Sequence, residues 1–136
     1  MRFFGQPKAV RVYVDAKILN MHDQSLPREA YVGYVVEGGK RRNVKKVDAT
    51  ESDDAEVEAI LFAVEDLRDP LGRLTVVCDH ESVVSEAKKD ALKNPSGPMR
   101  KLRAVLRANP SIRLEVLQAN PAHGVVTEYV NGLQKA

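Results

Sequence analysis

The sequence predicts an α/β fold in which helices pack on a five-stranded mixed sheet. The first observation is the order of the predicted elements: three strands, a helix, a strand, two helices, a strand and a final helix. The second is that a helix precedes the fourth strand, so this strand should pair parallel to an earlier one through a right-handed crossover. The third is composition, because 136 residues with 43% hydrophobic and 29% charged side chains are typical of a globular chain with one core. We therefore expect a single domain over residues 1–136.

The first strand is predicted over residues 10–18, where apolar and polar side chains alternate and β-branched residues are frequent. One of its faces carries valines, namely Val10, Val12 and Val14. The other face carries Arg11, Tyr13 and Asp15. Asp15 ends the most regular part of the strand and places a carboxylate there.

The next two strands are predicted as a hairpin over residues 30–37 and 40–49, joined at Gly38-Gly39, which is a two-residue turn signal. The third strand is dense in basic residues, namely Lys40, Arg41, Arg42, Lys45 and Lys46. Such density suits an exposed edge strand, where charge discourages pairing with other chains. It also suits a surface for phosphate groups, and the sequence leaves both interpretations open.

A helix is predicted over residues 53–68, ending before the breaker Asp69-Pro70-Leu71-Gly72. Glu56 continues the apolar stripe of this helix at its N-terminal end, a stripe formed by Ala59, Ile60, Ala63, Val64 and Leu67. Glu56 should therefore point toward the core, where a carboxylate is costly unless it is paired, neutralised or bound to a metal. The alternative is helix capping, with Asp53 as the N-cap residue and Glu56 three positions later.

The fourth strand, residues 73–79, is predicted to be buried and to lie beside the first. It ends in Asp79, and ligands collect beyond the carboxyl ends of parallel strands. Asp15 and Asp79 are therefore expected near one another, with Glu56 available as a third carboxylate. Cys78 shares a strand face with apolar residues and is expected in the core.

The rest of the chain is predicted as helices over residues 81–92 and 99–108, a fifth strand over 112–117, and a short helix over 124–134. Proline-containing breakers separate the first three of these elements. The last helix is preceded by His123, which could act in proton transfer or be an ordinary exposed loop residue. His22 and His80 have no evident partner and are expected to be structural.

Charge and residue usage exclude several classes of site. The net charge of +2 does not by itself indicate nucleic-acid binding, although a second basic group gathers late in the chain, at Arg100, Lys101, Arg103, Arg107 and Arg113. With one cysteine and no histidine cluster, a zinc site is not expected and a metal would be held by oxygen. No apolar run is long enough for a membrane span or a signal peptide, so we expect a cytoplasmic protein without membrane partners.

The order of elements, with these three acidic residues on the expected elements, resembles the ribonuclease H type 1 family over about residues 10–135. The segments that carry the resemblance are Val12-Tyr13-Val14-Asp15, Ala55-Glu56-x-x-Ala59 and Val76-Val77-Cys78-Asp79. The second strand is also similar, with Gly33 in the familiar place. The resemblance implies a ribonuclease H-like fold with strand and helix order βββαβααβα.

The resemblance further implies an endoribonuclease that cleaves the RNA strand of RNA–DNA hybrids. Catalysis would use two Mg²⁺ ions, or Mn²⁺, held by Asp15, Glu56 and Asp79, because paired cations can activate water and stabilise the leaving oxygen. His123 resembles the mobile histidine that helps proton transfer or product release. The biological substrate, protein partners and oligomeric state do not follow from the sequence.

A fourth acidic ligand is expected from the last helix, where the family has an Asp. Asn131 stands at that position and offers a neutral oxygen, whereas Glu128, one turn earlier, could supply the charge. Ala16 and Asp53-Asp54 also differ from the family's usual Gly and Asn residues. These differences support a second hypothesis, in which the chain is a catalytically weakened ribonuclease H-like module that binds nucleic acid or a protein partner.

Overall fold

The computed structural model describes residues 9–38, 41–67, 72–118 and 120–135. The strands are β1 (Ala9–Leu19), β2 (Glu29–Val36), β3 (Arg42–Val47), β4 (Arg73–Cys78) and β5 (Ile112–Val116). The helices are α1 (Ser52–Leu67), α2 (Glu81–Lys88), α3 (Gly97–Ala108) and α4 (Ala122–Lys135). This is the predicted order of elements, and the predicted α/β class with a five-stranded mixed sheet is confirmed.

The sheet has the strand order β3-β2-β1-β4-β5, which makes β1 its central strand. β3 is an edge strand, which is a position that its dense basic residues suit. β1 pairs antiparallel with β2 and parallel with β4. The parallel pairing follows from the α1 crossover, and the last pair in its register is Tyr13 with Val77. Asp15 and Asp79 each follow two residues later, so the register brings the two aspartates to the same end of neighbouring strands.

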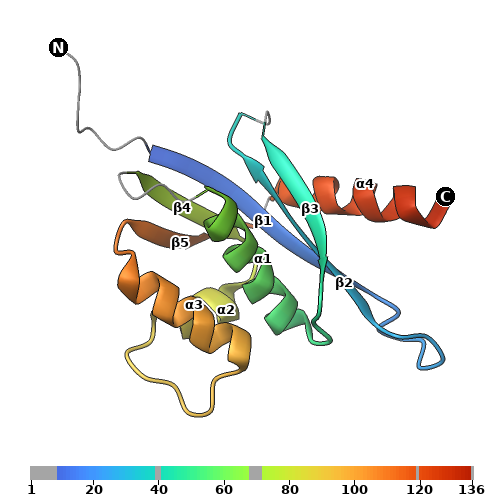
Figure 1. Ribbon diagram of the computed structural model, residues 1–136, viewed down its shortest axis with the longest axis horizontal. Helices are drawn as coiled ribbons and strands as arrows, with labels where there is room; N and C mark the ends of the chain where they lie inside the picture. Colours follow the sequence, from blue (N-terminus) through green and yellow to red (C-terminus); the bar gives the residue numbers. More distant parts are fainter. Residues whose placement is uncertain (1–8, 39–40, 68–71, 119, 136) are drawn as a thin grey trace.

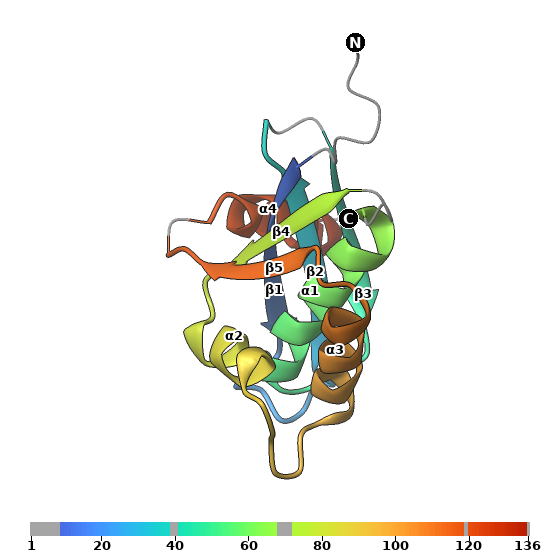
Figure 2. The same ribbon diagram turned by 90° about the vertical axis from the view of Figure 1, so that its left-hand side faces the viewer.

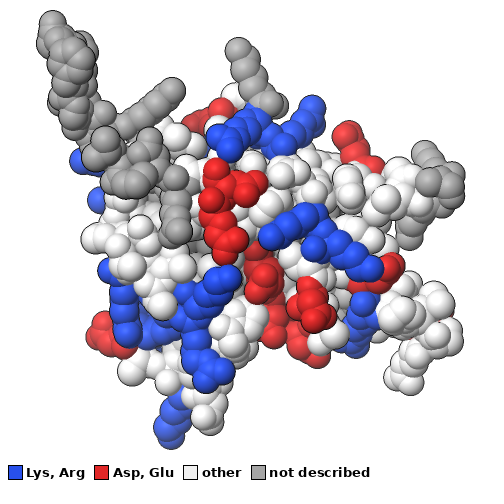
Figure 3. Space-filling view, viewed as in Figure 1, with Lys and Arg blue, Asp and Glu red and all other residues white. Residues whose placement is uncertain are grey.

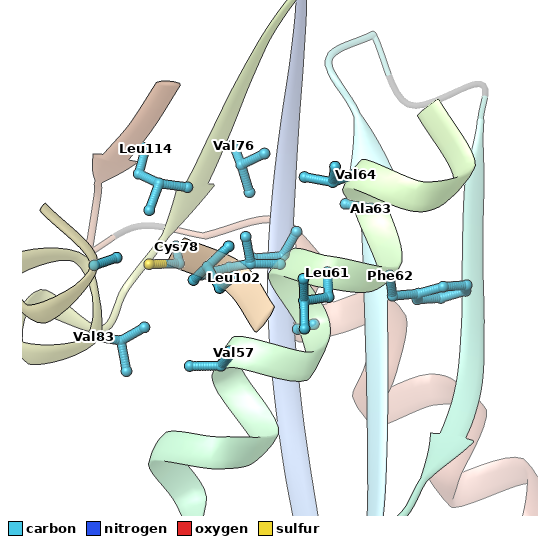
Figure 4. Close-up of a cluster of buried hydrophobic side chains, with 14 of the residues drawn as sticks. Val57, Leu61, Phe62, Ala63, Val64, Val76, Cys78, Val83, Leu102 and Leu114 are labelled. Carbon is cyan, nitrogen blue, oxygen red and sulfur yellow. The ribbon is translucent and has the colours of Figure 1, made fainter. Parts of the chain in front are cut away.

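Helices cover both faces of the sheet (Figures 1 and 2). α1, α2 and α3 pack on one face, and α4 lies on the other, against β1, β2 and β3. The main core forms between α1, α3 and the sheet, and Figure 4 shows Val57, Leu61 and Leu102 converging there. Cys78 is buried in this core, as predicted. A smaller apolar cluster, formed by Tyr31, Val126 and Val130, attaches α4 to the opposite face.

Several predicted boundaries shift because side chains bind helix ends. α2 stops at Lys88 instead of residue 92, because the Arg103 guanidinium donates to the carbonyls of Glu86 (2.9 Å) and Lys89 (2.7 Å) at its end. α3 begins at Gly97 instead of residue 99, because the Ser96 hydroxyl accepts from the Met99 amide at 3.2 Å.

The alternative interpretation, with Asp53 as the N-cap residue of the first long helix, does not match the structure. α1 begins at Ser52, and Asp53 lies inside its first turn. The amide of Ala55 donates to the carbonyl of Glu51, so the first turn is closed by backbone. Gly38 has the positive φ of 97° that a tight turn requires, whereas Gly39 and Lys40 lie outside the described residues and the two-residue hairpin stays a prediction. In the described part of the chain, none of the helices combines the length and hydropathy that a membrane span needs.

Candidate metal centre

Three carboxylates from separate elements meet at one end of the sheet. Asp15 comes from β1, Glu56 from the first turn of α1, and Asp79 directly follows β4. One oxygen from each lies within 4.8 Å of the others. The sequence therefore predicted this grouping correctly, although 64 residues separate Asp15 from Asp79 in the chain.

Each carboxylate reaches the cluster for a local reason. Asp15 lies on the face of β1 opposite to Val12 and Val14, whose side chains enter the main core. Glu56 lies on the same face of α1 as Ala59, Ile60 and Ala63, which are fully buried. This face packs toward the sheet, so the carboxylate of Glu56 is buried as well.

Burial makes this concentration of negative charge costly. Asp15 is 5% exposed and Glu56 is 3% exposed. Burial, reinforced by the charges of Asp15, Asp79 and Asp53, raises the pKa of Glu56 to about 9. Burial also raises the pKa of Asp15, against an opposing hydrogen bond from His123. The site is therefore short of positive charge.

Glu56 carries a buried oxygen atom that no described protein group compensates. Its Oε1 atom is fully buried and has no hydrogen-bond partner, and among described residues it is the one side-chain oxygen or nitrogen in this condition. Buried carboxylate oxygens are normally paired, protonated or bound to a cation. The residues fit a hard divalent cation such as Mg²⁺, which takes oxygen ligands.

His123 closes one side of the cluster. Its Nδ1 atom lies 3.0 Å from Oδ2 of Asp15, and it donates to that oxygen when it carries the proton. Asn120 holds the start of α4 in place, because its amide group donates to the carbonyl of Val14 at 2.6 Å and its Oδ1 accepts from the amide of Ala122. The His123 side chain is 71% exposed, so it stands at the solvent rim of the site.

Two residues at this site were missed by sequence reasoning, His80 and Lys17. Both line the cavity of about 300 Å³ that contains Asp15, Glu56 and Asp79. His80 was expected to be structural, but its Nδ1 lies 3.5 Å from Oδ1 of Asp53. The sequence could have indicated His80 as a site residue, because it directly follows Asp79. For Lys17 the signal was its position two residues after Asp15, on the same face of the strand.

The structure does not bring Glu128 or Asn131 to the cluster. α4 starts beside Asp15 and then crosses β2 toward β3, so that Glu128 lines a surface hollow with Arg42, Asn43 and Tyr129. Asn131 is exposed and lies eight residues beyond His123, or about 12 Å along the helix axis. The close packing of Val126 on Gly33 fixes this course of the helix.

Lys and Arg side chains lie on both sides of a band of acidic side chains on the face shown in Figure 3. Several of these cations already have partners in the protein. The Lys46 ammonium pairs with Glu29 at 2.8 Å, that of Lys101 pairs with Glu65 at 3.2 Å, and that of Lys45 lies 4.6 Å from the centre of the Phe62 ring. These contacts do not decide between the two interpretations of the basic residues on β3, which are protection of the sheet edge and contact with phosphate groups.

Comparisons with known proteins agree with this architecture. No protein-family model matches the sequence, and no curated protein matches it. Among solved structures, the chain is similar to LC11-RNase H1, isolated from compost by a metagenomic approach, with a TM-score of 0.73 and 20% identity. The match covers 93% of this chain and 99% of that one. The chain therefore has the ribonuclease H-like fold that the sequence predicted.

Proposed function

We propose that this protein is a metal-dependent endoribonuclease of the ribonuclease H type 1 family, which cleaves the RNA strand of RNA–DNA hybrids by phosphodiester hydrolysis. The observation that carries the proposal is the buried Asp15–Glu56–Asp79 cluster, with one oxygen of Glu56 unpartnered, at the carboxyl end of the central strands of a ribonuclease H-like sheet. Structural ion pairs would not leave such an oxygen without a partner.

The proposed cofactor is Mg²⁺, with Mn²⁺ as a substitute, held by Asp15, Glu56 and Asp79. When bound, such ions lower the pKa of water and stabilise charge on the departing oxygen. Burial, and after it the charges of Asp15, Asp79 and Asp53, raise the pKa of Glu56, so Glu56 would have to lose its proton before it could act as a metal ligand.

The side chains in and around the cluster have different proposed roles. Asp15 and Asp79 would act with Glu56 as the ligands that hold the divalent ions. His123 uses Nδ1 to contact Asp15, which leaves Nε2 at the exposed rim to give a proton to the departing oxygen or to take one from water. Lys17, at the edge of the cavity, is a cation that can contact a neighbouring phosphate.

The proposed substrate rests on the fold and on the name of the similar structure, which is a ribonuclease H1. A hybrid offers a 2′-hydroxyl on one strand, and that group is what distinguishes RNA from DNA at a given position. Basic side chains on either side of the acidic band, on β3 and α3, are suited to the backbones of the two strands (Figure 3).

The alternative is a weakened module that binds nucleic acid or a protein partner without efficient cleavage. One observation favours it: in the residues that the structure describes, the cluster contains three carboxylates, and α4 contributes His123 in place of a fourth. Fewer acidic ligands would weaken metal binding.

Cleavage of labelled substrates separates the two functions. The protein should cut an RNA–DNA hybrid, but not duplex RNA or duplex DNA, in Mg²⁺ or Mn²⁺. Asp15→Asn and Glu56→Gln should abolish cutting, whereas Glu58→Gln, the same change on the same helix outside the cluster, should preserve it. If the protein binds the hybrid but does not cleave it with either metal, the endoribonuclease hypothesis is wrong and the binding-module hypothesis is supported.

A second readout tests the metal centre apart from activity. Titration calorimetry should detect Mg²⁺ binding to the wild-type protein and to Glu58→Gln, and none to Glu56→Gln. Equal heats for all three proteins would show that the carboxylate cluster does not hold the ion.

A further inference from the structure

A second and larger cavity, of about 610 Å³, lies on another part of the molecule. It is a groove lined by the end of α2, the C-terminal half of α3 and the edge strand β5. Figure 2 shows these three elements on the same side of the molecule. The groove shares no lining residue with the carboxylate cavity. The groove is therefore a cavity separate from the one that contains the three carboxylates.

One wall of the groove is the outer edge of β5, which has no neighbouring strand on that side among the described residues. In β5, the carbonyl of Ser111 accepts from the amide of Leu74, and the amide of Leu117 donates to the carbonyl of Cys78. In a parallel pair, both polar groups of a residue point to the same side, and successive residues alternate. The odd-numbered residues thus bond to β4, and the amide and carbonyl groups of Leu114 and Val116 point outward into the open edge.

The floor of the groove is apolar and its rim is basic. The apolar residues are Ala87, Leu106, Ile112 and Leu114. Lys88, Lys89, Arg107 and Arg113 line the rim, and within the described chain none of these four forms an ion pair. Two acidic residues also line the groove: Glu115, which pairs with Arg11 at 2.8 Å, and Asp90, whose single carboxylate stands against the four basic side chains of the rim. The groove therefore carries an excess of unpaired positive charge beside free backbone donors and acceptors.

We propose that this groove binds an extended, acidic segment of a partner protein, which adds to the sheet as a sixth strand beside β5. The outward amide and carbonyl groups of β5 would pair with the segment's backbone. Apolar side chains of the segment would meet Leu106 and Leu114, and its carboxylates would meet Lys88, Lys89 and Arg107. Side chains that alternate to the other face would lie beside Arg113.

The charges select this occupant over others. A second copy of β5 would bring Arg113 and the rim lysines toward their own counterparts, and such repulsion disfavours edge-to-edge pairing of identical strands. A nucleic-acid strand would satisfy the cations, but it would leave the apolar floor and the alternating backbone groups without matching partners. An acidic strand complements all three features.

The test uses the full chain and a fluorescein-labelled peptide, Glu-Glu-Val-Glu-Val-Glu-Glu, followed by fluorescence anisotropy. The wild-type protein should bind this peptide, and a peptide with every Glu replaced by Gln should bind at least about tenfold more weakly, because the attraction is largely electrostatic. The Lys88→Glu/Lys89→Glu protein and Arg107→Glu should lose similar affinity. Arg100→Glu, an exposed site on α3 outside the groove, should bind like wild type.

The backbone contribution needs its own variant. Val116→Pro removes an outward-pointing amide at an exposed edge position, where proline is tolerated in a sheet. With its fold verified by circular dichroism, this variant should lose peptide binding, and the amide resonances of β5 should shift when the wild-type protein binds.

Three results would overturn the proposal. They are peptide binding that survives charge reversal, peptide binding that survives Val116→Pro, and a groove that binds a single-stranded oligonucleotide while failing to bind the peptide. Failure of the catalytic assay would not bear on these measurements, since binding is measured without metal or hybrid.

Discussion

His123 Nδ1 and Asp15 Oδ2 lie 3.0 Å apart, although 108 residues separate them in the chain. This contact joins α4 to the central strand at the carboxylate cluster. His123→Ala should lower kcat for hybrid cleavage by about 10²-fold, the usual loss when a general acid–base group is removed. Steady-state kinetics would check this, with His22→Ala, an exposed loop histidine, as the matched control. Unchanged kcat in His123→Ala would assign the residue a purely structural position.

The raised pKa of Glu56 makes the metal-free protein less stable as pH increases. The pKa of this carboxyl is about 9 in the folded state against an ordinary 4.5, so between these values the folded chain keeps a proton that the unfolded chain releases. The free energy of unfolding therefore falls as pH rises through this window. Glu56→Gln removes the effect and should stabilise the metal-free protein by about 3 kcal/mol more at pH 7.5 than at pH 5.

Urea unfolding in the presence of EDTA at the two pH values measures this difference. Glu58→Gln controls for the loss of a negative charge from α1 and should show little pH-dependent change. If Glu56→Gln and the wild type have the same stability difference between the two pH values, the pKa of Glu56 is not raised in the folded protein.

Asn131→Asp tests which part of α4 reaches the site. If Asn131 occupied the ligand position, a new carboxylate would raise activity or reduce the Mg²⁺ concentration needed. The structure instead places Asn131 in solvent, about 12 Å along the helix from His123, where a charge is screened beyond a Debye length. We therefore expect the Mg²⁺ concentration for half-maximal activity to change by less than about twofold in Asn131→Asp and in Glu128→Gln. A larger decrease in Asn131→Asp would show that α4 lies differently in the active protein.

Gly33 should be sensitive to the smallest substitution. It pairs with Asp15 across β1 and β2, and a Cβ atom there would lie 2.6 Å from Cγ2 of Val126 on α4. Gly33→Ala would push α4 off the sheet or force its side chains to repack, at a cost of about 1–3 kcal/mol. Thermal unfolding measures the loss. Gly132→Ala provides the comparison, because nothing lies within 4 Å of its added methyl group, and it should be neutral or stabilising.

The sheet and the three carboxylates could be predicted because each rests on a local pattern. Alternation identified β1, the helical stripe oriented Glu56, and the crossover rule placed Asp79 beside Asp15. The exact helix ends could not be predicted, because distant side chains set them. Arg103, for example, binds carbonyls at the end of α2 from another helix.

The sequence could not show which residue of α4 lies beside the three carboxylates, for a similar reason. The direction in which α4 crosses the sheet depends on Val126 packing against Gly33 and on Asn120 binding the carbonyl of Val14. These contacts join segments that are distant in sequence, and no periodicity signals them. His123, at the start of α4, was a candidate from the sequence and lies 3.0 Å from Asp15. His80 was not a candidate, because its partner Asp53 comes from a different element.

The parallel pairing of β1 with β4 has a kinetic consequence. Asp15 and Asp79 become neighbours only after the chain has completed β2, β3 and α1 and returned to the centre of the sheet, which makes theirs a contact of high sequence separation. An ion that needs both carboxylates has no site to occupy in the early, partly ordered chain. Metal binding would then lower the unfolding rate and leave the folding rate nearly unchanged. The metal-bound protein would stay folded for longer but would not fold faster.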